Sequence, residues 1–195
     1  MTRIISGAAG GRRLQTPKGD QTRPTSDRVR EALFSALDAW AGSWQGLRFL
    51  DLYAGSGAIG LEAWSRGAAA VTLVESDRRT ADLVRVNARS IGCDAADVVA
   101  RSVAAVLADG ARAPYDLVFS DPPYPLSEDH LAGDLVLLVE HGWLADGALV
   151  VVERSRRSPE PTWPSGLEPL PGKRRQKKYG ETVLWLAEAT DSLAP

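Results

Sequence analysis

Along most of this chain, segments with the apolar pattern of strands alternate with segments that have the apolar spacing of helices. From residue 47 onward, short unbroken apolar runs, typical of buried strands, alternate with stretches whose apolar residues stand three or four apart, typical of amphipathic helices. Gly67 and Gly92 mark the ends of two of these helices. The predicted strands are 48–54, 69–75, 96–101, 115–121 and 147–155, and the predicted helices between them are 58–67, 77–92, 102–110 and 127–142.

Alternation of strands and helices with unbroken apolar strands predicts a parallel sheet covered on both faces. After a proline-rich connection at 158–166, residues 173–189 have the pattern of a hairpin, which would add an antiparallel pair at the sheet edge. The predicted fold is therefore α/β, with a seven-stranded, mostly parallel sheet. Ligands of such doubly wound sheets bind at the carboxyl ends of the strands.

The N-terminal part has a different pattern. Residues 3–14, "RIISGAAGGRRL", have a glycine-rich turn between two basic runs, which predicts a small hairpin or an extended arm. A helix over 24–40 follows, with Thr25 among its capping candidates. We therefore predict a basic arm at 1–22 and one main domain at 23–190.

Composition restricts the class of protein. The chain has 195 residues, 44% of them hydrophobic, and a single cysteine, Cys93, which excludes an internal disulfide. Neither a signal-peptide pattern nor an apolar run long enough for a membrane span is evident, so we expect a cytoplasmic protein without membrane contact. His130 and His141 have no cysteine or carboxylate at metal-ligand spacing, and we expect no metal.

Positive charge is concentrated in two segments although the net charge is −2. Residues 3–30 hold seven Arg or Lys against two acids, and residues 154–178 hold eight against two. A polyanion responds to a local patch rather than to the sum, so this distribution favours nucleic-acid contact. The candidate RNA-binding residues are Arg3, Arg12, Arg13, Lys173 and Arg174. The last two belong to the predicted late hairpin, where strand side chains can face either way.

The stretch "RFLDLYAGSGAIG" contains Gly55, Gly57 and Gly60 in the G-x-G-x-x-G spacing of a dinucleotide site. It also suits S-adenosylmethionine, and Asp51 discriminates between the two. A carboxylate at the end of the first strand would repel a pyrophosphate, whereas it suits a ligand that carries an ammonium and a sulfonium. Glu75, at the tip of the next strand, can accept ribose hydroxyls in either case.

The tetrapeptide Asp121–Tyr124, D-P-P-Y, follows the fourth strand and matches the signature of amino-group methyltransferases. The exocyclic nitrogen of a base is a poor nucleophile because its lone pair is delocalised into the ring. The carboxylate of Asp121 and the carbonyl of Pro122 can accept its two N–H bonds and favour charge build-up on the nitrogen. Pro123 helps to stiffen the loop, and Tyr124 offers a face on which a flipped base can stack.

Together, "RIISGAAGGRRL", "TRPTSDRVREALFSAL", "FLDLYAGSGAIGLEAWSRGA", "VTLVESD", "DPPY" and "GWLADGALVVVE" make nearly the whole chain resemble the RsmD family. The resemblance implies a Rossmann-like class I methyltransferase that transfers a methyl group from S-adenosylmethionine to N2 of guanine 966 of 16S rRNA. Its product would be S-adenosylhomocysteine, its substrate a partly or fully assembled small ribosomal subunit, and its working state a monomer. The catalytic residues implied are Asp121, Pro122, Pro123 and Tyr124, and the cofactor-binding residues are Thr25, Arg28, Asp51, Tyr53, Ala54, Gly55, Ser56, Gly57, Glu75, Ser76, Ser102 and Val103.

Two other functions remain open at this point. The D-P-P-Y signature also occurs in DNA adenine-N6 methyltransferases, although this chain has no room for a separate target-recognition domain. A catalytically silent RNA-binding module is the second alternative. Ser102 stands where many relatives have Asp or Asn beside the adenine amine of the cofactor, and its hydroxyl can still accept that hydrogen bond.

Overall fold

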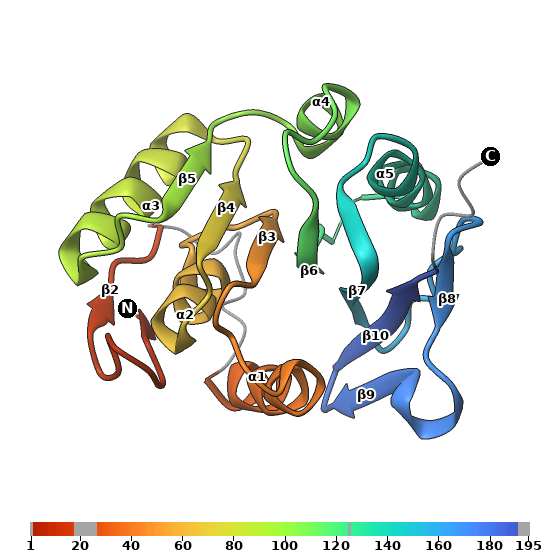
Figure 1. Cartoon of the computed structure of the whole chain (residues 1–195), viewed down its shortest axis with the longest axis horizontal. Helices are drawn as coiled ribbons and strands as arrows, with labels where there is room; N and C mark the ends of the chain where they lie inside the picture. The colour runs from red at the N-terminus through yellow and green to blue at the C-terminus, as the bar shows by residue number, and fades with distance from the viewer. Residues whose placement is uncertain (1, 18–26, 125, 191–195) are drawn as a thin grey trace. The chain divides into compact units, whose positions relative to one another are not determined.

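The computed structural model describes residues 2–17, 27–124 and 126–190 (Figure 1). Its contacts divide the chain into two compact units, Met1–Arg101 and Ser102–Pro195, each of which is described by itself. In the described part of the chain, no helix has the length and apolarity needed to cross a membrane.

The first unit is built on a three-stranded parallel sheet in the order β5-β4-β3 (Figure 1). Each strand is followed by a helix or a turn into one, so every connection is a crossover, as the strand–helix alternation predicted. Helix α2 contacts β3 and β4, and helix α3 contacts β5. The strands are β3 (Arg48–Leu52), β4 (Ala70–Val74) and β5 (Ala96–Val99), and the helices are α2 (Ala58–Arg66) and α3 (Arg78–Ile91).

Both helices end where the sequence predicted. Gly67 and Gly92 stand at the two C-caps with positive φ angles of 122° and 78°. Helix α3 begins after Asp77, whose side chain accepts a 2.8 Å hydrogen bond from the main-chain N–H of Thr80. Local capping chemistry therefore fixes the limits of α3.

Helix α1 (Asp27–Ala41) buries four apolar residues that stand at helical spacing, Val29, Leu33, Phe34 and Leu37. Trp40, which stands at the same spacing, is half-buried. The residues Thr25 and Ser26, candidates for its cap, lie outside the described residues. Before it, the N-terminal hairpin, residues 2–14, pairs β1 (Thr2–Arg3) with β2 (Arg13–Leu14) in antiparallel fashion, which confirms the predicted hairpin.

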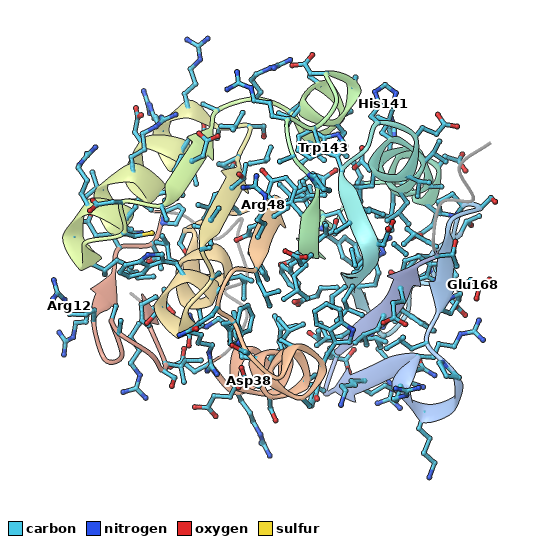
Figure 2. All side chains as sticks on the ribbon, in the orientation of Figure 1. Arg12, Asp38, Arg48, His141, Trp143 and Glu168 are labelled. Atoms are coloured by element: carbon cyan, nitrogen blue, oxygen red, sulfur yellow. The ribbon has the colours of Figure 1, made fainter. Side chains whose placement is uncertain are left out.

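In the second unit, β6 and β7 pair in parallel, and β10 pairs with β7 in antiparallel fashion. Strands β9 and β8 both pair with β10, along its first and second halves. Trp143, labelled in Figure 2, stacks on Tyr115 and donates a 3.0 Å hydrogen bond to the carbonyl of Leu107. The elements are α4 (Val103–Ala108), β6 (Tyr115–Ser120), α5 (Glu128–Glu140), β7 (Leu144–Ser155), β8 (Leu167–Pro169), β9 (Gln176–Tyr179) and β10 (Thr182–Ala189).

Two details of this unit differ from the sequence analysis. Strand β8 is one strand more than the seven predicted, and its three residues are too few for a recognisable apolar pattern. Lys173 and Arg174 were expected on the first strand of the late hairpin, but they lie in a short 3₁₀ helix, η1 (Gly172–Arg174), before β9. Pro171 and a positive φ of 59° at Gly172 turn the chain there.

Candidate active site

The glycine loop, Tyr53–Gly57, joins β3 to α2 in a backbone conformation that L-residues rarely adopt. Tyr53 has a φ of 62° and is the single non-glycine residue with positive φ among those described. Gly55 also has a positive φ, and a Cβ built on it would meet no atom within 4 Å. The main chain at Gly55 is therefore open to a ligand, and the unfavourable φ of Tyr53 is a cost that often marks a functional loop.

Gly57 has a different task from Gly55. A Cβ at Gly57 would lie 2.8 Å from Cγ1 of Val84 on α3, so this glycine is required for packing as well as for its φ of 79°. A Cβ at Gly60 would lie 2.8 Å from Cδ2 of Leu73 on β4. Gly60 thus makes a close contact between α2 and the sheet.

Glu75 holds the glycine loop with one carboxylate oxygen and the residue before α3 with the other. Its Oε2 accepts a 3.0 Å hydrogen bond from the N–H of Gly55, and its Oε1 accepts one of 2.8 Å from the N–H of Asp77. The side chain is half-buried and lies at the end of β4. Each carboxylate oxygen retains a second lone pair, so Glu75 can position the loop and still accept a hydroxyl.

Asp51 is fully buried at the end of β3, with 1% of its surface exposed. Its Oδ2 accepts a 2.8 Å hydrogen bond from the N–H of Gly60, in the first turn of α2. A carboxylate is favourable there because the first N–H groups of a helix lack partners within the helix. Asp51 therefore anchors the N-terminus of α2 to the end of β3.

The remaining loop residues contribute main chain. The N–H of Ala54 donates to the carbonyl of Val74 at 2.9 Å, and the carbonyl of Ser56 accepts from the side chain of Asn87 at 2.9 Å. Ser76 is exposed just beyond Glu75. Two carboxylates, those of Asp51 and Glu75, together with the open main chain of Gly55, fit a cationic ligand such as S-adenosylmethionine better than a pyrophosphate.

Two further cofactor candidates precede the glycine loop in sequence. Thr25 lies outside the described residues, and Arg28 is exposed on the first turn of α1. Next to it, Asp27 forms ion pairs with Arg30 at 2.7 Å and with Arg3 at 3.7 Å.

In the second unit, Ser102 is the N-cap of α4. Its Oγ accepts a hydrogen bond of 3.4 Å from the N–H of Ala105, which gives the hydroxyl a structural partner. The following Val103 is 4% exposed. The serine hydroxyl can still accept or donate a further hydrogen bond.

The D-P-P-Y loop, Asp121–Tyr124, directly follows β6. Asp121 is half-buried, Pro122 is buried, and the carbonyl of Pro123 accepts a 2.8 Å hydrogen bond from the N–H of Leu126. Tyr124 is 82% exposed, which is rare for a large aromatic ring and leaves a face open for stacking. The loop therefore places the half-buried carboxyl of Asp121 three residues before the exposed ring of Tyr124.

The surroundings of the Asp121 carboxyl shift its pKa upward. Burial raises its pKa to about 7, and the guanidinium of Arg154 opposes the rise. Burial, followed by repulsion from Asp121, raises the pKa of Glu153 on β7 to about 8, against a hydrogen bond with Thr182 that lowers it. Arg154 itself is 8% exposed and forms an ion pair with Glu128 of α5. Sequence reasoning missed Glu153, although an acid at the end of the apolar run "GALVVV" was a signal.

The N-terminal hairpin is fixed to α2 by polar contacts that the sequence analysis also missed. Glu62 of α2 is completely buried and accepts hydrogen bonds from the N–H groups of Ile5, at 2.6 Å, and Ser6, at 3.0 Å. Ser65 accepts from the N–H of Ala9 at 2.9 Å. Gly7 passes so close that a Cβ would lie 1.8 Å from the carbonyl oxygen of Ser65. The hairpin is therefore a docked element.

The three arginines of the hairpin that are candidates for RNA binding differ in the contacts that they make with the rest of the protein. Arg3 pairs with Asp27, and Arg12, labelled in Figure 2, donates to the carbonyl of Ser90 on α3. Arg13 is exposed and forms no ion pair with a described residue. All three guanidinium groups lie at the surface of the first unit.

Lys173 and Arg174 are exposed on η1 in the second unit. An open hollow of about 460 Å³ lies beside them, lined by Gly172, Lys173, Gln176 and Lys178. Arg175 next to them forms an ion pair with Glu160, so not all the cations of this segment are available to a ligand.

Comparison with known proteins identifies the family. The family model described as "Conserved hypothetical protein 95" matches residues 2–188. Ribosomal RNA small subunit methyltransferase D of Escherichia coli is 41% identical over 163 residues, which cover 84% of this chain and 79% of that protein. The chain belongs to the RsmD family. The Haemophilus influenzae protein of the same name is 36% identical over 160 residues, 80% of each chain.

Solved structures agree with membership of the RsmD family. The structure of yhhF from Escherichia coli has a TM-score of 0.82 and 36% sequence identity, and the match covers 96% of this chain and 97% of that one. The chain thus has the class I methyltransferase fold predicted from its sequence, a mostly parallel sheet with antiparallel C-terminal strands and a small N-terminal hairpin.

Proposed function

We propose that this protein transfers a methyl group from S-adenosylmethionine to the exocyclic N2 of guanine 966 of 16S rRNA. Its substrate is the partly or fully assembled small subunit, and it works in the cytoplasm as a monomer. The observation that carries the proposal is the D-P-P-Y loop, in which the half-buried Asp121 and the exposed Tyr124 stand three residues apart. The names of its RsmD relatives, which refer to the small-subunit ribosomal RNA, support the choice of substrate.

The glycine loop would bind the cofactor. Gly55 offers open main chain, and Glu75 accepts the ribose hydroxyls with its remaining lone pairs. Asp51 keeps the N-terminus of α2 in place and contributes negative charge near the ammonium group. Arg28 and Thr25 belong to the segment that would close over the methionine end, and Ser102 and Val103 to the adenine end. When bound, S-adenosylmethionine supplies the activated methyl group.

The D-P-P-Y loop would hold the target base. Tyr124 stacks on the flipped guanine, a contact that contributes roughly 1–3 kcal/mol. Asp121 and the carbonyl of Pro122 accept the two N–H bonds of the amine, which directs the nitrogen lone pair towards the methyl group. After methylation the nitrogen must release one proton, and the ionised Asp121 carboxylate is a suitable acceptor because its pKa is raised towards neutrality.

The N-terminal arm, residues 1–22, would bind RNA phosphates beside the main domain, 23–190. Arg3, Arg12 and Arg13 supply its charge, and Lys173 and Arg174 of the second unit supply a further basic surface beside the hollow. Such contacts orient the RNA without reading its sequence.

Radioactive methyl transfer to isolated small subunits tests the proposal. Subunits from a strain lacking this methyl group, deproteinised 16S rRNA and double-stranded DNA would each be incubated with labelled S-adenosylmethionine, and the modified nucleoside would be identified by mass spectrometry. We expect N2-methylguanosine in subunits, and none with the Asp121→Ala variant. N6-methyladenine in DNA would favour the alternative methyltransferase, and RNA binding without transfer would indicate a silent module. Calorimetric binding of NAD in place of S-adenosylmethionine would contradict the cofactor assignment.

A further inference from the structure

Glu153 is a shielded acid that the proposed function does not use. Ser120 of β6 pairs with Val152 of β7, and the two strands run parallel. The next residues along them, Asp121 and Glu153, therefore stand side by side with side chains on the same face. The repulsion that Asp121 exerts on Glu153 is consistent with this placement.

No cation neutralises Glu153 in the part of the chain that the structure describes. Its Oε2 is buried without a hydrogen-bond partner among the described residues, and the carboxyl has a hydrogen bond with Thr182 of β10. A buried carboxylate oxygen without a partner is costly when ionised and much less so when protonated. The local structure therefore favours a neutral Glu153.

The charged groups around Glu153 are engaged elsewhere or stand apart. On its own strand, Arg154 forms an ion pair with Glu128 of α5. On β9, Lys177 is separated from Glu153 by Leu184, which is the register partner of both. Tyr179 stands opposite Thr182, and burial raises the pKa of its hydroxyl, so it stays uncharged at neutral pH.

We propose that Glu153 is the positioning residue of Asp121, a buried neutral acid that keeps its proton while Asp121 is ionised. The pair then carries one negative charge, held on the residue that faces the amine. The body of Glu153 restricts where the Asp121 carboxylate can point, and a proton on Oε2 gives that carboxylate a neighbouring donor. If Glu153 were ionised instead, its negative charge would favour protonation of Asp121. A protonated Asp121 would have fewer lone pairs with which to accept the N–H bonds of the amine. The role in catalysis rests on the proposed function, whereas the charge state of the pair does not.

A carboxyl NMR titration of the protein alone tests the charge state. With ¹³C-labelled Asp and Glu, we expect Glu153 to titrate above pH 7 and to shift to lower pH in D121N, where the neighbouring charge is absent. Asp121 should titrate in a single step in E153Q. Titration of Glu153 in the ordinary range of glutamate, or no change in D121N, would overturn the inference. This measurement needs neither cofactor nor RNA, so it is independent of the methyl-transfer assay.

Kinetics test the positioning. We expect E153A to lower kcat about tenfold or more with little change in KM for S-adenosylmethionine, and E153Q, which is neutral and retains a donor, to recover most of that loss. E168Q on β8, where Figure 2 labels Glu168, is the matched control at an exposed acid of the same unit. If E153Q loses as much turnover as E153A, or if E153A matches wild type, the inference is wrong. Absence of methyl transfer by the wild type would instead contradict the proposed function.

Discussion

The side-chain amide of Asn87 donates a 2.9 Å hydrogen bond to the main-chain carbonyl of Ser56, in the middle of the glycine loop. The same amide donates to the carbonyl of Gln15 at 2.9 Å, and its Oδ1 accepts from the N–H of Gln15 at 2.8 Å. Asn87 is 1% exposed, so its polar atoms depend on these partners. One residue of α3 therefore holds both the segment after the hairpin and the candidate cofactor loop.

We expect Asn87→Ala to destabilise the protein by about 1–3 kcal/mol, because it leaves shielded main-chain groups unpaired. It should also weaken S-adenosylmethionine binding through the loosened loop. Thermal unfolding and titration calorimetry measure the two effects. Arg89→Ala, at an exposed position of the same helix, is the control. An intact cofactor affinity in Asn87→Ala would show that the loop holds its shape without this contact.

The carboxylate of Glu75 should contribute to the affinity for S-adenosylmethionine. We expect Glu75→Ala to weaken S-adenosylmethionine binding by about 1.5–3 kcal/mol, the range for a lost hydrogen bond to a charged group. Glu75→Gln keeps one acceptor oxygen and should lose less. Calorimetry with Glu31→Ala as the control, an exposed acid on α1, gives the comparison. Equal affinities for all three variants would place the cofactor elsewhere.

Asp121 should show whether the site needs a charge or only an acceptor. Asp121→Ala should lower turnover about a hundredfold or more, the usual effect of removing one preorganised polar group. Asp121→Asn keeps an acceptor oxygen and should retain more. Because the Asp121 carboxyl has a pKa of about 7 and accepts hydrogen bonds when ionised, wild-type turnover should fall as pH drops below 7. In Asp121→Asn the turnover rate should no longer fall below pH 7. Single-turnover rates measured from pH 6 to 8 test this, and a fall that remains in the variant would contradict the assignment.

Tyr124 is expected to act through its ring rather than its hydroxyl. Tyr124→Phe should stay close to wild type, whereas Tyr124→Ala should lose base stacking and with it turnover. Neither should unfold the protein, because 82% of the side chain is exposed. An inactive but folded Tyr124→Phe would instead point to a proton-transfer role for the hydroxyl.

The charged face of the hairpin should determine the salt dependence of RNA binding. Changing Arg12 and Arg13 together to Ala should flatten the slope of log affinity against log salt by roughly 1–2 units, since each neutralised phosphate contributes about 0.7 to 0.9. Arg78 and Arg79, exposed on α3, provide a matched double control. Cofactor affinity should stay constant. A slope equal in both double variants would remove the hairpin from the RNA interface.

Most elements of the fold could be predicted because their signals are local. The helical spacing of Leu33, Phe34 and Leu37 and the terminal glycines of α2 and α3 act within a few residues, and the structure confirms them. Strand β8 was missed because its three residues gain their strand conformation from β10 rather than from their own pattern.

In the candidate site, too, the features that could be predicted are local, and those that could not depend on residues far away in the sequence. The open main chain at Gly55 follows from its motif, but the packing of Gly57 against Val84 depends on a helix that begins twenty-one residues later. Glu62 is charged in a sequence pattern that suits a solvent-facing helix position, yet it is buried by hydrogen bonds to residues more than fifty positions earlier. Such partners cannot be found from spacing along the chain.

The docking of Gly7 against Ser65 has a consequence for how this protein can change over evolutionary time. The hairpin is held by its main chain, through Glu62 and Ser65, and position 7 tolerates only glycine. Its outward side chains, such as Arg13, take no part in that attachment. Selection can therefore exchange the outer residues one at a time while the inner skeleton stays constant. The hairpin thus gives descendants of this chain a surface whose charge can change without loss of its attachment to α2.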